Sequence, residues 1–93
     1  MAKIIWTKKS LKDLKSIFDY VSIDSSFYAA RFITRLALRV DQLEIFPESG
    51  RIVPEKEDPS IREIIEGNFR IFYRIQRGNI TILRIHNAAR KIK

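Results

Sequence analysis

Cysteine is absent from the sequence, and histidine occurs once, as His86. Without cysteine the chain can form no disulfide, offers no thiol nucleophile and has no thiolate ligand for a metal, which is typical of a cytoplasmic protein. A single histidine argues against a structural zinc and against a two-histidine metal site. We therefore expect neither a metal nor another cofactor.

Long apolar segments are missing as well. No stretch approaches the roughly 20 apolar residues that cross a bilayer, and the N-terminus lacks the charged segment and apolar run of a signal peptide. The sequence also contains no internal repeat and no low-complexity segment. These absences predict one soluble domain that spans residues 1–93 and has no membrane partner.

Acidic residues are fewer than basic ones. The chain has 18 lysines and arginines against 11 aspartates and glutamates, which gives a formal charge of +7. Such a surplus favours polyanionic partners, with nucleic acid as the first candidate. The alternative is that the surplus lysine serves solubility alone.

The first half of the sequence shows helical periodicity. Residues 3–7 predict a short strand that stops where the Thr7 hydroxyl can cap a helix. Apolar residues then recur at spacings of three and four, which predicts a helix over about 8–21 and a second one from Ser25 or Ser26 to near Ile45. We expect these helices to pack as an antiparallel hairpin.

The second half predicts strands after a long loop. All three prolines of the chain lie in residues 47–60, a length that indicates either a function or a short strand within the loop. Apolar runs follow at 61–65, 69–75 and 80–86, and the residues between them tolerate positive φ, so both breaks predict hairpin turns. The predicted order is β-α-α-β-β-β, an α+β fold with an N-terminal helical hairpin packed on a twisted antiparallel sheet.

The length of the last turn determines which arginines share a face of the sheet. A three-residue loop, 77–79, would pair Gln76 with Ile80, whereas a two-residue loop would mix isoleucines and arginines on both faces. We therefore expect the longer loop. It places these side chains on the face away from the helices: Arg70, Phe72, Arg74, Ile82, Arg84 and His86. The same register assigns Phe69, Ile71, Tyr73, Ile75, Thr81, Leu83 and Ile85 to the helix side. The turn at Gly67 leaves open whether Arg62 or Glu63 joins Arg70.

The predicted open face combines arginines, an aromatic ring and the imidazole. Arginines can bind phosphate through two hydrogen bonds and stabilise charge in a transition state, and histidine can transfer a proton near neutral pH. The alternative is a solvated sheet face, because arginine stems cover apolar surface. The acidic cluster of Glu55, Glu57 and Asp58 is more typical of a solvated loop than of a catalytic site.

Four segments together resemble a known family: IIWTKKSLKDLKSIFDYV (4–21), LEIFPESGRIVPE (43–55), IREIIEGNFRIFYRI (61–75) and ITILRIHNAAR (80–90). In this order and spacing they resemble the RelE/ParE superfamily, the toxins of bacterial and archaeal toxin–antitoxin pairs. The resemblance implies two helices on a twisted antiparallel sheet, in a small basic toxin that arrests growth when free. The implied partners are a cognate ParD/RelB-like antitoxin and, as the target, either DNA gyrase or the ribosome with its mRNA.

The resemblance also implies roles for particular residues. Arg70 matches an arginine of RelE-like mRNA-cleaving members, Arg90 matches a second one, and His86 lies near the position of a histidine used by others. In an RNA-cleaving toxin these residues would be catalytic, and Arg62 could assist proton transfer. Residues expected to bind the target or nucleic acid are Arg74, Arg84, Phe72, Lys91 and Lys93.

Departures from the cleaving members favour the other branch. Residues 61–63 replace a lysine pair, and no tyrosine follows Arg90. The tryptophan in the first strand and the FPESGR segment resemble the ParE-like plasmid-stabilisation branch, which inhibits gyrase. The alternatives are a metal-independent, ribosome-dependent mRNA endoribonuclease and an inactive toxin-like module that binds an antitoxin. For a partner groove, Trp6, Phe27 and Tyr28 are the candidate exposed aromatics.

Overall fold

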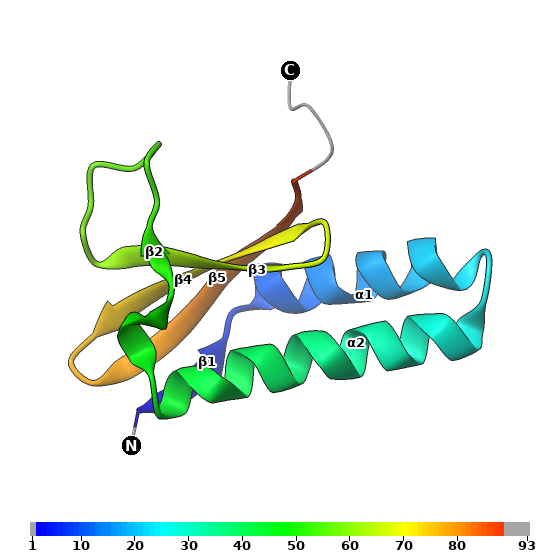
Figure 1. The fold of residues 1–93 in the computed structure, drawn as a ribbon, viewed down its shortest axis with the longest axis horizontal. Helices are drawn as coiled ribbons and strands as arrows, with labels where there is room; N and C mark the ends of the chain where they lie inside the picture. Colours follow the sequence, from blue (N-terminus) through cyan, green and yellow to red (C-terminus); the bar gives the residue numbers. More distant parts are fainter. Residues whose placement is uncertain (1, 89–93) are drawn as a thin grey trace.

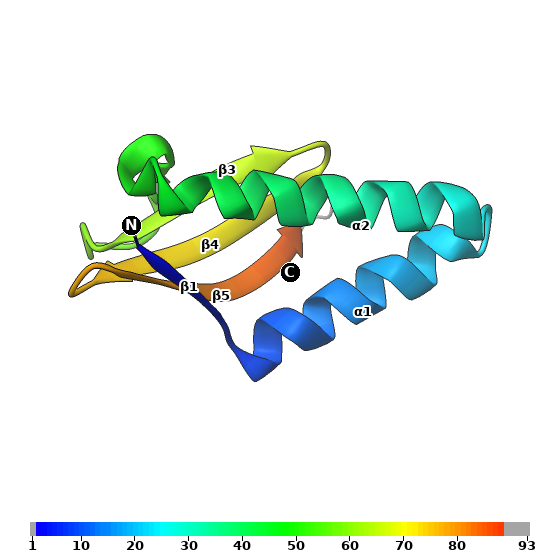
Figure 2. The ribbon, with the colours of Figure 1, turned by 90° about the horizontal axis from the view of Figure 1, so that it is seen from below.

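The computed structural model of the chain describes residues 2–88. Its elements are β1 (Lys3–Trp6), α1 (Lys8–Ser22), α2 (Ser26–Asp41), the 3-10 turns η1 (Gln42–Glu44) and η2 (Pro47–Ser49), β2 (Arg51–Ile52), β3 (Ile61–Glu66), β4 (Phe69–Gln76) and β5 (Asn79–Asn87). Both helices lie on one side of the sheet, and the turn between them projects past the end of the strands (Figures 1 and 2). The α+β fold with an N-terminal helical hairpin is confirmed. Within residues 2–88, no helix is long and apolar enough to cross a bilayer.

Hydroxyl caps fix where the helices begin. The Thr7 side chain accepts a hydrogen bond from the Ser10 backbone N–H at 3.1 Å and donates to the Ile82 carbonyl at 2.8 Å. It therefore starts α1 and ties that start to β5. Ser25 caps α2 in the same way. The second helix ends at Asp41, short of Ile45, and the chain tightens into η1 before the proline at the start of η2.

The sheet has five strands in the order β1-β5-β4-β3-β2. The meander of β3, β4 and β5 is antiparallel as predicted, but β1 runs parallel to β5, so the sheet is mixed. The proline-rich segment contains the short strand β2, which pairs Arg51 with Glu63 and Ile52 with Arg62. A two-residue strand has no periodicity, and this is why the sequence did not locate it.

The hydrophobic core lies between the sheet and the helical hairpin. On α2 the buried residues recur at spacings of three and four, as the sequence predicted. The core contains Ile17, Phe32, Leu36, Val40, Leu43, Ile64, Phe69, Ile71, Tyr73, Ile80, Ile82 and Ile85. One face of the sheet is therefore packed against helices, and side chains on the other face are available for a site.

The turn between β4 and β5 differs from the prediction. It has two residues, because Gln76 pairs with Asn79, and Arg77 and Gly78 both have positive φ, 51° and 78°. Positive φ at both central positions is the pattern of a type I′ hairpin turn. The three-residue loop expected from the sequence is wrong.

A bulge nevertheless restores the predicted register farther along. Tyr73 pairs with Ile82, but Phe72 pairs with Arg84, so Leu83 is an extra residue in β5. The extra residue reverses the alternation of side chains, and Ile80, Ile82 and Ile85 can all be buried. No regular register allows this. Consequently Ile82 lies in the core, and Thr81 lies opposite Arg74 on the other face, contrary to prediction.

Candidate functional site

Arg70 and His86 are direct cross-strand neighbours on β4 and β5, on the face away from the helices. Phe72 lies beside both of them. The guanidinium carbon of Arg70 is 4.9 Å from the centre of its ring, and the His86 ring meets it edge-on at 5.3 Å between centroids. The predicted grouping of these three side chains on one face is confirmed.

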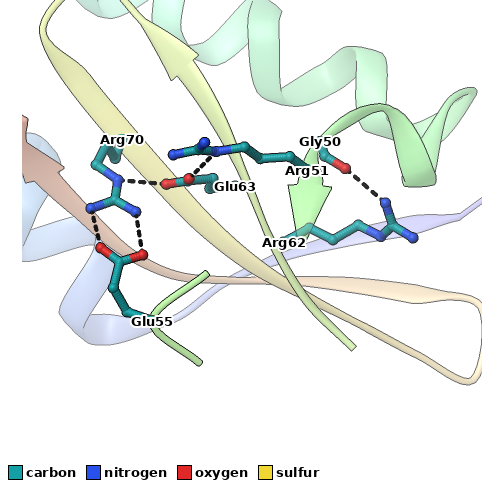
Figure 3. Close-up of polar contacts among 6 residues, drawn as sticks. All are labelled: Gly50, Arg51, Glu55, Arg62, Glu63 and Arg70. Carbon is teal, nitrogen blue, oxygen red and sulfur yellow. Dashed lines mark hydrogen bonds and ion pairs between the residues drawn. The ribbon is translucent and has the colours of Figure 1, made fainter. Parts of the chain in front are cut away.

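The guanidinium of Arg70 is already occupied by carboxylates (Figure 3). Its Nη1 and Nη2 donate to the two carboxylate oxygens of Glu55 at 2.9 and 3.1 Å, and its Nε donates to Glu63. These hydrogen bonds raise the pKa of Arg70. The hydrogen bond from Arg70 lowers the pKa of Glu55 to about 2. Arg70 therefore presents no free fork of donors to a phosphate in this arrangement.

Glu63 is the buried centre of the site. It is 1% exposed and accepts hydrogen bonds from both Arg51 and Arg70. A carboxylate is rarely buried unless it is paired, and the two guanidinium groups provide that pairing. Glu63 reaches this face because the β3–β4 turn has two residues, with Glu66 opposite Phe69. The sequence left the choice between Arg62 and Glu63 open and gave no functional role to Glu63. Its signal was a carboxylate in the middle of an otherwise largely apolar run, residues 61–65.

Arg62 lies on the opposite side of β3. It pairs with Tyr73, and its Nη1 donates to the backbone carbonyls of Gly50 and Glu48 at 2.8 and 3.3 Å. It therefore holds the segment before β2 and does not reach Arg70. The prediction that Arg62 could assist chemistry at Arg70 is wrong, because the two-residue turn places it on the helix side of the sheet.

The remaining arginines of the face are also paired. Arg74 contacts Asp58 at 3.4 Å, and Arg84 binds both oxygens of Asp13 on α1 at 2.8 and 3.1 Å. The sequence predicted an open cationic face, but carboxylates neutralise the positive charge of these arginines. The loop predicted to be solvated supplies two of them, Glu55 and Asp58, because it folds over the sheet.

Asp13 connects the site to the helical layer. Besides Arg84, it accepts a hydrogen bond from the backbone N–H of Ile85 at 2.9 Å. Burial alone would raise the pKa of Asp13, but the hydrogen bonds from Arg84 and Ile85 outweigh it and lower that pKa below its usual value. The partner guanidinium has its pKa raised by the same hydrogen bond. Arg84 therefore stabilises the junction of α1 and β5.

Arg90, Lys91 and Lys93 lie outside the described residues. Within residues 2–88 no group of three or more histidine, aspartate or glutamate side chains is arranged to hold a metal ion. Arg70, Phe72 and His86 thus lie together on this face, with the guanidinium of Arg70 held by Glu55 and Glu63.

A separate groove with both aromatic and polar lining lies between the helical hairpin and the β3–β4 turn. It is lined by Tyr20, Val21, Tyr28, Phe32, Arg35, Gly67, Asn68, Phe69 and Asn87. Phe27 and Tyr28 are exposed near it, 72% and 53%, as predicted. Trp6 is instead partly buried and packs against the core, so it cannot serve as an exposed aromatic.

Comparison with protein families identifies one match over almost the whole chain. Residues 4–92 match the model described as the ParE toxin of the type II toxin-antitoxin system, parDE. The chain is 35% identical over 91 residues to toxin RelE2 of Caulobacter vibrioides, a match that covers 97% of this chain and 99% of that one. It is also 35% identical over 88 residues to the putative toxin Y4kP of Sinorhizobium fredii, covering 92% and 88%.

Solved structures show the same fold. A chain of the chromosomal ParDE system from P. aeruginosa superposes with a TM-score of 0.78 at 26% identity, covering 94% of this chain and 96% of that one. A chain of the RelBE2 toxin-antitoxin complex from Mycobacterium tuberculosis superposes with a TM-score of 0.70 at 18% identity, covering 92% and 96%. The second likeness concerns the fold alone.

Proposed function

This chain belongs to the ParE toxin family of type II toxin-antitoxin systems, and on that premise we propose that it arrests growth by inhibiting DNA gyrase. We further propose that a cognate ParD/RelB-like antitoxin neutralises it. The observation that carries the choice of target is the occupation of Arg70 by Glu55 and Glu63.

This occupation opposes RNA cleavage for an electrostatic reason. A nuclease that uses Arg70 needs its positive charge where negative charge develops on the phosphate. Here Glu63 is buried against Arg70, and its negative charge would lie beside the reacting group. Arg62 is on the other side of the sheet, so its positive charge cannot offset the negative charge of Glu63 at this site. A toxin that acts by binding a protein does not need a free cationic centre on this face.

The antitoxin proposal is supported by the apolar surface at the end of the helical hairpin. Ile23 and Phe27 are 78% and 72% exposed, and the groove lined by Tyr28 also includes the rings of Phe32 and Phe69. Both structural neighbours come from toxin–antitoxin systems. An antitoxin segment that covered this surface would remove apolar area from water, which is the main source of binding free energy at such interfaces.

A supercoiling assay tests the target. The purified chain is mixed with DNA gyrase and relaxed plasmid, and supercoiling is expected to fall as the chain is titrated in. The same chain bound to its antitoxin is the control and should leave supercoiling intact. Normal supercoiling at a saturating concentration of the free chain would contradict the proposal.

A ribosome-dependent mRNA endoribonuclease is the second candidate. The contact of Phe72 with both Arg70 and His86 favours it, because these groups could hold a phosphate and move a proton. Translating ribosomes incubated with the chain should then yield cut mRNA, and His86→Gln should abolish the cuts. Intact mRNA would exclude this candidate. Harmless overexpression without antitoxin would instead indicate an inactive antitoxin-binding module.

A further inference from the structure

Two carboxylates hold Arg70 in very different ways. Glu63 comes from the middle of β3, its side chain is fully buried, and it is shared with Arg51. Glu55 comes from the connection between β2 and β3, and its side chain is 61% exposed. Breaking the contact with Glu63 would take away one of the two partners of a buried carboxylate, which is costly. Glu55 can exchange Arg70 for water at little cost, because exposed ion pairs contribute little.

Glu55 binds Arg70 in the geometry that an oxyanion would use. Its two oxygens meet Nη1 and Nη2 side by side, the paired contact that guanidinium also makes with phosphate. Figure 3 shows Glu55 below the two terminal nitrogens of this fork and Glu63 beside Nε. Removal of Glu55 would therefore free two parallel donors while Glu63 still fixes the orientation of the guanidinium through Nε.

The same loop also restrains the next arginine of β4. Arg74 contacts Asp58 at 3.4 Å, and both side chains are partly exposed. If residues 54–58 moved off the sheet, Arg51, Arg70 and Arg74 would present three positive charges against the single negative charge of Glu63. A net charge of this sign beside a free guanidinium fork attracts an anion.

We propose that Glu55 is a displaceable occupant of an oxyanion-binding site on Arg70, and that Nη1 and Nη2 bind a phosphate group when residues 54–58 move away. The site is a feature of the chain itself and does not depend on gyrase being the target. Glu55 acts as a built-in competitor, so the apparent affinity for phosphate is reduced by the fraction of molecules in which Arg70 is free.

Substitution of the competitor tests the proposal. The purified full chain, Glu55→Gln and Glu57→Gln are titrated at one ionic strength with pyrophosphate and with a short single-stranded RNA, and binding is measured by calorimetry. Glu57 is a matched control because it is an exposed carboxylate of the same loop with no ion pair in the described part of the chain. Glu55→Gln is expected to bind pyrophosphate at least about fivefold tighter than the unchanged chain, and Glu57→Gln within about twofold, since distant exposed charges are screened by salt.

A second variant assigns the gain to Arg70. Glu55→Gln combined with Arg70→Lys keeps a positive charge beside Glu63 but removes the fork, so the gain should disappear while circular dichroism shows an intact fold. A gain with pyrophosphate alone indicates free phosphate as the ligand, and a gain with both probes indicates a nucleic-acid backbone. Equal affinity of the two single variants, or a gain that survives Arg70→Lys, would overturn the proposal.

Discussion

The hydroxyl of Tyr73 occupies the space where a side chain at Gly50 would begin. It accepts a hydrogen bond from the Gly50 N–H at 3.0 Å and donates one to the Pro47 carbonyl at 2.7 Å. A Cβ at Gly50 would lie 2.5 Å from that hydroxyl and 2.5 Å from the backbone oxygen of Glu63. The phenol thus holds the segment that delivers Arg51 to the site.

Gly50→Ala should destabilise the fold by about 1–3 kcal/mol, the usual cost of forcing an extra methyl group into a packed interior. The backbone at Gly50 is extended, with φ −79°, so the effect is one of space and not of backbone strain. Urea denaturation of the variant and of Ser49→Ala, an exposed neighbour, would measure it. Equal stability of both variants would show that the close approach at Gly50 is unimportant.

Glu63→Gln should destabilise the protein much more than Glu55→Gln. The neutral amide removes the charge shared by Arg51 and Arg70 in a buried position, for which a loss of about 2 kcal/mol or more is expected. Glu55 is exposed, so its substitution should leave the free energy of unfolding nearly unchanged. Chemical denaturation of both variants compares them directly. A larger loss for Glu55→Gln would reverse the roles assigned to the two carboxylates.

Much of the fold was predictable because its signals are local. The periodic apolar residues of α1 and α2 gave the helices, and the residues after Glu66 and Gln76 gave the turns between strands. The parallel pairing of β1 with β5 was not predictable, since nothing in residues 3–6 specifies a partner at the far end of the chain. Pairing between distant segments is determined by the packed core as a whole.

The sequence predicted which side chains share the face of the candidate site, but it did not predict the carboxylates that pair with them. Placing Arg70, Phe72 and His86 on one face needed only alternation along β4 and β5. The bulge at Leu83 was not predictable from alternation, because a regular strand has no extra residue and the alternation of side chains holds only on either side of it. The pairing of Glu55 with Arg70 was missed because the path of a proline-rich loop leaves no periodic pattern in the sequence.

Acid should weaken the fold partly through Asp13. Its folded-state pKa is lowered, so its contribution to stability is present above the unfolded pKa and is lost as the pH falls through the folded value. Asp13→Asn should therefore show a lower Tm near neutral pH and a smaller fall in Tm between about pH 5 and pH 2.

Asp24→Asn, at an exposed position without an ion pair in the described residues, is the control. A fall in Tm as steep for Asp13→Asn as for the unchanged chain would contradict the assignment.

The β4–β5 turn should be open to stabilisation at Arg77. Arg77 adopts φ 51°, a left-handed conformation that a long side chain rarely takes and that asparagine tolerates well. Arg77→Asn creates the Asn-Gly pair preferred in type I′ turns and should raise stability by about 0.5–1 kcal/mol, since the folded backbone is unchanged. Thermal and urea unfolding would measure the gain. Gly78→Ala is the opposite control: its added methyl group meets no atom within 4 Å, but φ 78° strains any L side chain, so stability should fall. If Arg77→Asn were no more stable than the unchanged chain, the left-handed turn geometry would carry no measurable cost at Arg77.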